Sequence, residues 1–526
     1  MSDAVGIEPA RVRVPAPARR LFLSVALLTF AVYLVSARGL PQTFDEQIVL
    51  DTTTSLAHRE ANIKTPLLLA APGLSVQRRD GSRVGIYGLG TSLASLPFYA
   101  AGQVAAWVSP PEKRARVIAT AMMFTNALIT AATVLVLMLV CFLLGAPPPG
   151  AVLIGLSFGL GSYAYPHAIS MFTEPGTALC VIAALLFAIR ASRGGRRSDL
   201  VACGAIAASA LLFRISAALF LPLFGIWLLV AGARARDLRQ SVRFGAWFSA
   251  GAFGPLILLL AVNRWRYGSP WNFGYTLSSA GQSYPIVRGL AGQWLSSGKS
   301  LFLYAPITLV ALLGVGRAFK KVPLEMCLLG GIVLANTIFF ARVQFWSGDW
   351  AWGPRYMQIV LPCVAAMAAP LMEVRFWRRA LLVVSVFGFL FAALPAVFMR
   401  ITFVFYSAYH AMPPPSGHGP PVWDHSYYAL VWHTLHWQPI LYQLRRLPDA
   451  FANSFDHVTT PFGPPGPTRF PGAPRLELWW LRVRDIGSSA ALFFALLPAT
   501  AAFVGLRNLK RYRRSQRELT TDLPSA

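Results

Sequence analysis

Apolar stretches recur along almost the whole chain, and the short polar segments between them carry most of the charged residues. Each stretch is about 17 to 25 residues long, which is the length of a helix that crosses the hydrocarbon core of a bilayer. A backbone in hydrocarbon must pair its own N–H and C=O groups, and a helix does this within one segment. The pattern therefore predicts an all-α polytopic membrane protein.

Clusters of Arg and Lys between the apolar stretches predict the orientation. They lie at residues 11–20, 190–197, 234–243, 317–321, 375–379 and 507–517. Cytoplasmic loops are enriched in such residues, so an even number of crossings should separate one cluster from the next. The C-terminal half meets this rule with spans near residues 244–263, 301–316, 324–341, 356–372, 380–399 and 486–506. The whole chain is then expected to cross about 12 times, with both termini inside.

Two segments of the N-terminal half need a special arrangement. Residues 200–230 lie between two basic clusters, so they should cross twice as a tight hairpin that turns near Arg214. Apolar runs that begin near residues 21, 86, 117, 151 and 172 precede the cluster at Arg190, and one of them must fail to cross. We expect this of residues 86–108, which are rich in Gly and Ser and contain Pro97, so that they are re-entrant or lie in the interface.

This topology divides the chain into five parts. Residues 1–20 form a basic cytoplasmic N-terminus, and the run at 21–37 is expected to be an uncleaved signal anchor. A transmembrane bundle covers residues 21–399 and includes a long first outer loop at 38–116. Residues 400–485, rich in Pro and aromatic residues, are expected to form an extracytoplasmic cap. The last span at 486–506 and a basic cytoplasmic tail at 507–526 follow.

Composition agrees with the apolar pattern and limits the meaning of the charge. The 526 residues are 55% hydrophobic and 13% charged, against about 25% charged in soluble domains. The net charge of +26 is divided among short clusters and forms no continuous basic face, so it indicates membrane topology and anionic lipid head groups instead of nucleic acid. The five cysteines fall in apolar spans without paired spacing, and we predict no disulfide framework.

Candidate acidic residues lie at the outer ends of predicted spans, where ionisable groups are costly and often functional. In the run Thr43-Phe-Asp-Glu-Gln47, Asp45 and Glu46 offer a general base for a hydroxyl nucleophile. A plain alternative is that Asp45 caps a helix from Glu46 to about His58. Glu174 begins a later apolar span and is followed by Pro175, so it either caps that helix or orients an acceptor or a metal.

Candidate cations occupy similar positions. Lys299 and Arg355 each lie just outside a span, where they can bind a phosphate at the interface or extend toward lipid head groups. The Gly-Pro before Arg355 and the flanking Trp350 and Trp352 favour a built site. The outer loop at 263–275 ends at Tyr275 and is rich in aromatic rings and amides, which suit either sugars or an interfacial aromatic belt.

The sequence gives weaker evidence for metal binding and for the role of one further arginine. Arg214 is either a buried structural ion or a phosphate contact. His433 and His436 have a spacing suited to a metal, but no carboxylate or cysteine lies near them, so we predict no metal site there and leave open a divalent metal as a possible helper.

Several of these motifs resemble those of the C-type (GT-C) membrane glycosyltransferases. The Asp45-Glu46 pair after the first span, the Tyr87-Gly-Leu-Gly90 run and Glu174-Pro175 look like motifs of protein O-mannosyltransferases and of lipid A aminoarabinose transferases. The segments around Lys299 and Arg355 resemble those of bacterial mannosyltransferase-like members. A Lys-Pro-Pro or Tyr-Pro-Pro element of the family is replaced here by residues 87–90, and a large C-terminal soluble domain found in some relatives is missing.

The resemblance implies an inverting transfer from a polyprenyl-phosphate sugar to a hydroxyl of a lipid, glycan or protein. By that similarity Asp45 is the base, Glu46 or Glu174 positions the acceptor, and Arg355 and Lys299 hold the donor phosphate. We also expect Tyr87, Trp352 and Tyr275 to contact substrate. The implied location is the outer, periplasmic face of a bacterial inner membrane.

Two other classes of protein share the polytopic, basic character. A transporter or lipid flippase should have ionisable residues near mid-membrane and broken helices in related halves, whereas the candidates here gather at one face and we find no internal duplication. A non-catalytic membrane scaffold would make the adjacent carboxylates and the Trp-Gly-Pro-Arg run a coincidence. We therefore expect an enzyme.

Overall fold

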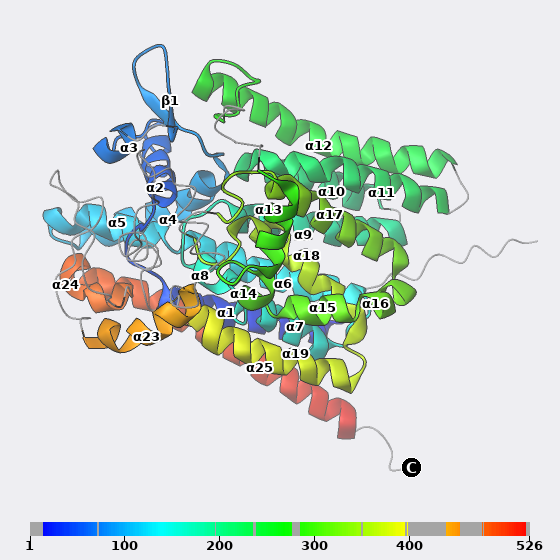
Figure 1. Cartoon of the computed structure of the whole chain (residues 1–526). Coiled ribbons are helices and arrows are strands. Elements are labelled where there is room, and N and C mark those ends of the chain that lie inside the picture. Colours follow the sequence, from blue (N-terminus) through cyan, green and yellow to red (C-terminus); the bar gives the residue numbers. More distant parts are fainter. Residues whose placement is uncertain are drawn as a thin grey trace, which may run out of the picture.

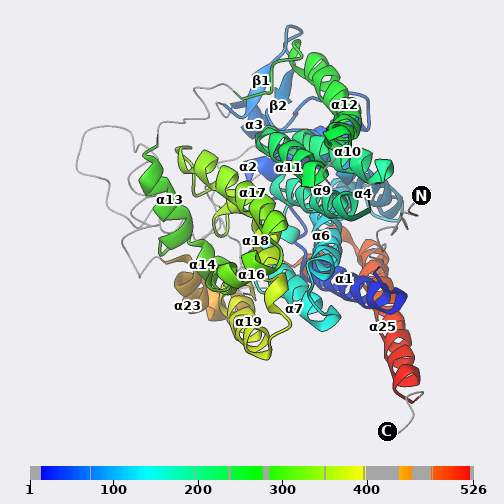
Figure 2. The same cartoon turned by 90° about the vertical axis from the view of Figure 1, so that its right-hand side faces the viewer.

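The computed structural model describes residues 14–70, 73–194, 196–234, 238–275, 284–348, 351–394, 438–452 and 478–521, together with residues 397 and 476 (Figures 1 and 2). Regular structure in this part of the chain is almost entirely helical. The strands β1 (Ser75–Gln77) and β2 (Arg83–Gly85) pair antiparallel in a small hairpin. The predicted all-α fold class is confirmed.

Seven helical segments are long and apolar enough to cross a membrane. They are α1 (Ala16–Ser36), η1 to α6 (Pro111–Leu143), α9 (Glu174–Gly194), η2 to α11 (Ile215–Arg234), α12 (Leu238–Tyr267), α17 (Pro323–Ala341) and the Ser488–Ser515 part of α25 (Ser488–Thr521). Within the second segment, η1 is Pro111–Lys113, α5 is Arg114–Met122 and α6 is Thr125–Leu143. These lengths and compositions are those of a multi-pass membrane protein. The count of about 12 crossings stays a prediction.

Three predicted spans are interrupted by short or irregular helical pieces. The span at 301–316 consists of α14 (Leu301–Tyr304), α15 (Ile307–Leu313) and the start of α16 (Val315–Lys321). The span at 356–372 consists of η3 (Arg355–Ile359), α18 (Leu361–Met367) and η4 (Ala369–Leu371). The third span begins as α19 (Arg375–Phe387) and continues as the π-helical η5 (Gly388–Ala393). Pro306, Pro362 and Pro370 stand at the first two sets of breaks, because proline lacks the N–H that would continue a helix.

The chain breaks at Arg214, where the sequence predicted a turn, while the double crossing of residues 200–230 and the re-entrant or interfacial placement of residues 86–108 stay predictions. Helix α10 (Arg197–Phe213) ends at Arg214, whose backbone is extended, and η2 (Ile215–Leu219) and α11 (Phe220–Arg234) follow. Helix α4 (Gly90–Trp107) contains Pro97, packs on α2 (Phe44–Leu56) and α5, and is not among the seven segments above.

The bundle is held by close helix pairs, of which α10 with α12 and α1 with α25 are the most extensive. In the first pair, a Cβ on Gly204 would lie 1.9 Å from the Phe248 carbonyl oxygen, and one on Gly251 would lie 2.1 Å from the Val201 carbonyl oxygen. The two helices therefore touch backbone to backbone, as glycine permits in membrane helices. Helix α6 packs on α1, α7 (Pro148–Gly159) and α9 in the centre of the core.

Residues of the predicted first outer loop lie at one end of the bundle, where Figure 1 shows α2, α3 (Pro66–Ala70) and β1 grouped together. Short helices complete the described chain: α8 (Ala164–Ala168), α13 (Ile286–Leu295), α23 (Pro439–Ala452), η7 (Trp479–Arg482) and α24 (Val483–Ile486). The indole of Trp479 donates to the Leu34 carbonyl at 2.7 Å and so fixes η7 to the end of α1. Most of the predicted cap at 400–485, with its proline runs, lies outside the described residues.

Candidate active site

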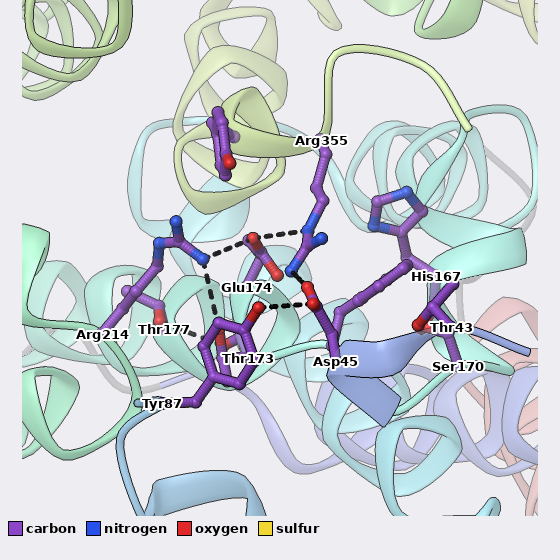
Figure 3. A network of polar contacts seen from close by, with 12 residues as sticks. Thr43, Asp45, Tyr87, His167, Ser170, Thr173, Glu174, Thr177, Arg214 and Arg355 are labelled. Atoms are coloured by element: carbon purple, nitrogen blue, oxygen red, sulfur yellow. Dashed lines mark hydrogen bonds and ion pairs between the residues drawn. The ribbon is translucent and has the colours of Figure 1, made fainter. Parts of the chain in front are cut away.

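Four charged side chains from distant parts of the sequence form a chain of ion pairs, which we call the ion cluster: Asp45, Glu174, Arg214 and Arg355 (Figure 3). One guanidinium nitrogen of Arg355 lies 2.5 Å from Asp45 Oδ2, and its Nε lies 2.8 Å from Glu174 Oε1. Arg214 reaches the same oxygen of Glu174 at 2.6 Å. All four residues were singled out in the sequence, Arg214 as either a structural ion or a phosphate contact, and the structure joins them through the two arginines.

The ion cluster is buried unevenly. The side chain of Glu174 is fully buried, and that of Arg355 is 7% exposed, whereas Arg214 and Asp45 retain 12% and 17% exposure. Burial opposes the charge of Arg355, but the carboxylates of Asp45 and Glu174 prevail and hold its pKa well above the usual value. Asp45 and Arg214 therefore form the more exposed side of the cluster, and Glu174 and Arg355 form its base.

The start of α2 explains why Asp45 points into the cluster. Thr43 is the N-cap, its hydroxyl accepts from the Glu46 N–H, and the Glu46 carboxylate accepts from the Thr43 N–H, which together make a capping box. The alternative that Asp45 caps a helix starting at Glu46 is therefore wrong. Because Thr43 already supplies the capping oxygen, Asp45 in the first turn is free to pair with Arg355.

Glu46 has a different position from its neighbour. It is 1% exposed, and its carboxylate accepts from the N–H groups of Gln42 at 2.6 Å, Thr43 at 3.0 Å and Met171 at 3.2 Å. Burial raises its pKa, although Arg38 and these N–H groups act in the opposite direction. Glu46 thus ties the start of α2 to the segment just before Glu174, and the bonds to the backbone engage both of its oxygens.

Tyrosines complete the exposed side of the cluster. The Tyr87 hydroxyl donates to Asp45 Oδ1, and the Tyr87 ring lies edge-on to that of Tyr275 with centroids 6.3 Å apart. Burial raises the pKa of Tyr87 further above its usual value, and the Asp45 carboxylate adds to this effect, so the hydroxyl keeps its proton. Both tyrosines were sequence candidates for substrate contact, and both lie beside Asp45.

Aromatic rings line the two arginines. The Arg355 guanidinium lies 4.0 Å from the centroid of Phe172, and that of Arg214 lies 4.7 Å from the centroid of Tyr356. Phe172 and Tyr356 were not singled out in the sequence, although each is close in sequence to a candidate residue. Rings on the arginine faces leave the guanidinium edges for hydrogen bonds in a fixed plane.

Lys299 and Trp352 stabilise the segment that precedes Arg355. The fully buried ammonium of Lys299 donates to the Ala351 carbonyl, and the Trp352 ring packs edge-on to Tyr304 at 5.2 Å. His167 Nε2 lies 2.9 Å from the Trp352 carbonyl, and burial lowers the pKa of His167 to about 4, so the ring is neutral and donates this bond. The cation predicted at Lys299 therefore contacts the backbone just before Arg355.

Metal ligands do not group together in the described residues: no set of three or more His, Cys, Asp or Glu side chains there is arranged to hold an ion. His433 and His436 lie outside the described residues. The charges of the ion cluster balance, since two carboxylates face two guanidiniums.

Comparisons with known proteins find a likeness in fold. No protein-family model matches the chain, and no curated protein matches its sequence. Among solved structures, ArnT from Cupriavidus metallidurans bound to undecaprenyl phosphate is similar over 93% of this chain and 77% of its own, with 16% identity and a TM-score of 0.44. ArnT from the same organism in the apo state gives 15% identity and a TM-score of 0.40 over the same shares. ArnT is a lipid A aminoarabinose transferase.

Proposed function

We propose that this chain is an inverting membrane glycosyltransferase that moves a sugar from a polyprenyl-phosphate donor to a hydroxyl of a lipid, glycan or protein. The observation that carries the proposal is the ion cluster itself. It combines a partly exposed carboxylate with two arginines whose planar forks suit a phosphate. Such a transfer needs a proton acceptor for the hydroxyl and fixed cations for the phosphate that leaves.

The position of the cluster along α9 supports a site at one membrane face. Helix α9 begins at Glu174 in the cluster and has 21 residues, so its other end lies about 30 Å away. At that end Arg193 pairs with Glu325 at the start of α17, near other basic residues. About 30 Å is the thickness of a bilayer core, and basic ends normally face the cytoplasm. We therefore infer that the site faces the periplasm of a bacterial inner membrane.

The chemistry divides between Asp45 and the arginines. The acceptor oxygen bonds to the anomeric carbon as the bond from that carbon to the phosphate oxygen breaks, and Asp45 takes the hydroxyl proton. The electron pair of the broken bond stays on the polyprenyl phosphate, which gains one negative charge. Arg355 and Arg214 stabilise that charge, which is greater in the transition state than in the donor.

In this scheme Arg355 pairs first with Asp45 and then with the donor phosphate. It pairs with Asp45 Oδ2 in the structure, while Tyr87 holds Oδ1. When a phosphate binds Arg355, Oδ2 is released and faces the acceptor, and the bond from Tyr87 keeps the carboxylate oriented. Glu174 stays buried and keeps both guanidiniums in place.

The other sequence candidates then have supporting roles. Glu46 holds α2 against the segment before Glu174, and Lys299 and Trp352 support the segment before Arg355. Tyr275, beside Tyr87, faces the sugar. We assign Glu46 and Lys299 no contact with substrate, because the fold engages their charged groups.

A donor-cleavage assay tests the proposal. Purified protein in liposomes of envelope lipids is given a panel of undecaprenyl-phosphate monosaccharides, and release of undecaprenyl phosphate is followed by mass spectrometry. We expect Asp45→Asn to reduce release by about 100-fold or more, in the range of a lost general base. Asp80→Asn, a change at an exposed carboxylate in the β1–β2 hairpin, is the matched control and should keep full activity. Full activity in the Asp45 variant would remove the proposed base.

A further inference from the structure

The segment that carries Tyr87 into the site has no regular structure of its own. Residues 86–89 join β2 to α4 without belonging to either. The Tyr87 hydroxyl nevertheless has to reach Asp45 from this segment. Something outside the segment must therefore fix its backbone.

The end of α12 provides that support. Arg266 donates to the carbonyl of Tyr87 at 2.8 Å and to that of Gly85 at 2.6 Å. The hydroxyl of the next residue, Tyr267, lies 3.0 Å from the Gly85 carbonyl and 3.3 Å from that of Ile86. Two adjacent side chains thus bind three consecutive carbonyls about 180 positions earlier in the sequence. We call Arg266 and Tyr267 the α12 clamp.

The electrostatics of Arg266 are unusual for a structural arginine. The residue is 2% exposed, and no ion pair joins it to a carboxylate anywhere in the described chain. Its Nε is buried without a hydrogen-bond partner, and its guanidinium lies 4.8 Å from the centroid of the Tyr267 ring. A buried charge compensated only by carbonyls and a ring is costly, and a neutral side chain would avoid that cost.

The other side of the same segment is fixed by α10. A Cβ on Gly88 would lie 2.3 Å from the Leu212 carbonyl oxygen and 2.7 Å from that of Phe213, so the segment lies directly on the last turn of α10. The next residue along α10 is Arg214 of the ion cluster. The segment is therefore held between the ends of α10 and α12, next to the position from which Arg214 extends into the ion cluster.

We propose that Arg266, together with Tyr267, is a positioning residue for the reaction: it sets the Tyr87 hydroxyl on Asp45 Oδ1 and so aims Oδ2 of the base at the acceptor. This inference rests on the proposed function for its effect on turnover. The clamp on residues 85–87 is a separate physical claim. Arg266 acts through Tyr87 and does not contact the substrate.

Hydrogen exchange tests the clamp without any need for activity. In the purified full-length protein, Arg266→Lys and Tyr267→Phe should raise the exchange rate of amides in a peptide covering residues 85–90 by about tenfold or more, because its backbone loses fixed partners. Arg264→Gln is the matched control, since Arg264 lies two residues away on the same helix, is exposed and bonds within its own turn. Unchanged exchange in both clamp variants overturns the inference, whatever the transfer assay shows.

A double-mutant cycle tests the route through Tyr87. Arg266→Lys and Tyr87→Phe should each lower kcat by a similar factor with KM little changed, and the double variant should be no slower than Tyr87→Phe alone. If the two losses multiply, Arg266 does not act through Tyr87 and the positioning role is overturned. If the wild type cleaves no polyprenyl-phosphate sugar, the proposed function fails, and the exchange result still decides whether the clamp exists.

Discussion

Asp45 and Glu46 are neighbours in sequence but have opposite surroundings. Asp45 is partly exposed and bonded to two side chains, Arg355 and Tyr87. Glu46 is buried and bonded to three backbone N–H groups. From the sequence we expected Asp45 to be the base and Glu46 or Glu174 to position the acceptor. The bonds of Glu46 to the backbone could not be predicted, because its partner Met171 is distant in sequence.

Replacing Glu46 by Gln tests this division of roles. A carboxylate can accept on both oxygens, whereas an amide has one oxygen, so its NH₂ would face at least one backbone N–H. An unsatisfied buried donor costs about 1–3 kcal/mol, and we expect a lower unfolding temperature of the detergent-solubilised protein. Glu60→Gln, at an exposed residue that pairs with Lys64 and accepts from the Asn62 amide at 3.5 Å, should leave the temperature unchanged. An unaltered unfolding temperature with lost transfer would return Glu46 to the reaction itself.

At the scale of elements, the sequence predicted well what depends on local pattern. The long apolar helices and the break at Arg214 follow from length and charge. The placement of residues 86–108 outside the set of crossings stays a prediction. The division of the spans at 301–316 and 356–372 is marked by proline. Contacts between elements were not predictable, because the support of Tyr87 by Arg266 or of Trp352 by His167 depends on which helices pack together.

The backbone contact between α10 and α12 makes a prediction at this scale. In Gly251→Ala, the new methyl group meets the Val201 carbonyl at 2.1 Å, and backbone cannot move aside as a side chain can, so the helices must separate. We expect a loss of about 1–3 kcal/mol in the free energy of unfolding, measured by denaturation in detergent. Gly254→Ala on the same helix meets no atom within 4 Å and should be neutral or slightly stabilising. Equal stability of the two variants would contradict this packing.

At the scale of the whole molecule, the candidate active site and the basic residues near Arg193 lie at opposite ends of one helix. The ion cluster lies at one end of α9, and ion pairs such as Arg193 with Glu325 lie at the other. The sequence indicated this polarity, because the candidate residues and the basic clusters alternate along the chain. It could not show that Asp45, Glu174 and Arg355 touch one another, since that contact follows from the packing of α2, α9 and η3.

Labelling of introduced cysteines tests the predicted orientation. In a background with the native cysteines replaced, Arg79→Cys in the hairpin and Arg317→Cys in α16 offer two exposed positions. A membrane-impermeant maleimide should label the first in intact spheroplasts and the second only after permeabilisation, because the basic end is expected inside. The reverse order of labelling would place the ion cluster in the cytoplasm.

The central claim is that Arg355 exchanges its partner Asp45 for a phosphate of the donor. The most direct test is to measure binding of undecaprenyl phosphate to the purified protein by native mass spectrometry. Arg355→Gln should weaken binding by about tenfold or more, since a charge-assisted bond to a phosphate is lost. Asp45→Asn removes the competing carboxylate, so it should bind at least as tightly as the wild type although its sugar transfer is reduced by about 100-fold or more. Undiminished binding in Arg355→Gln, or weakened binding in Asp45→Asn, would contradict the account.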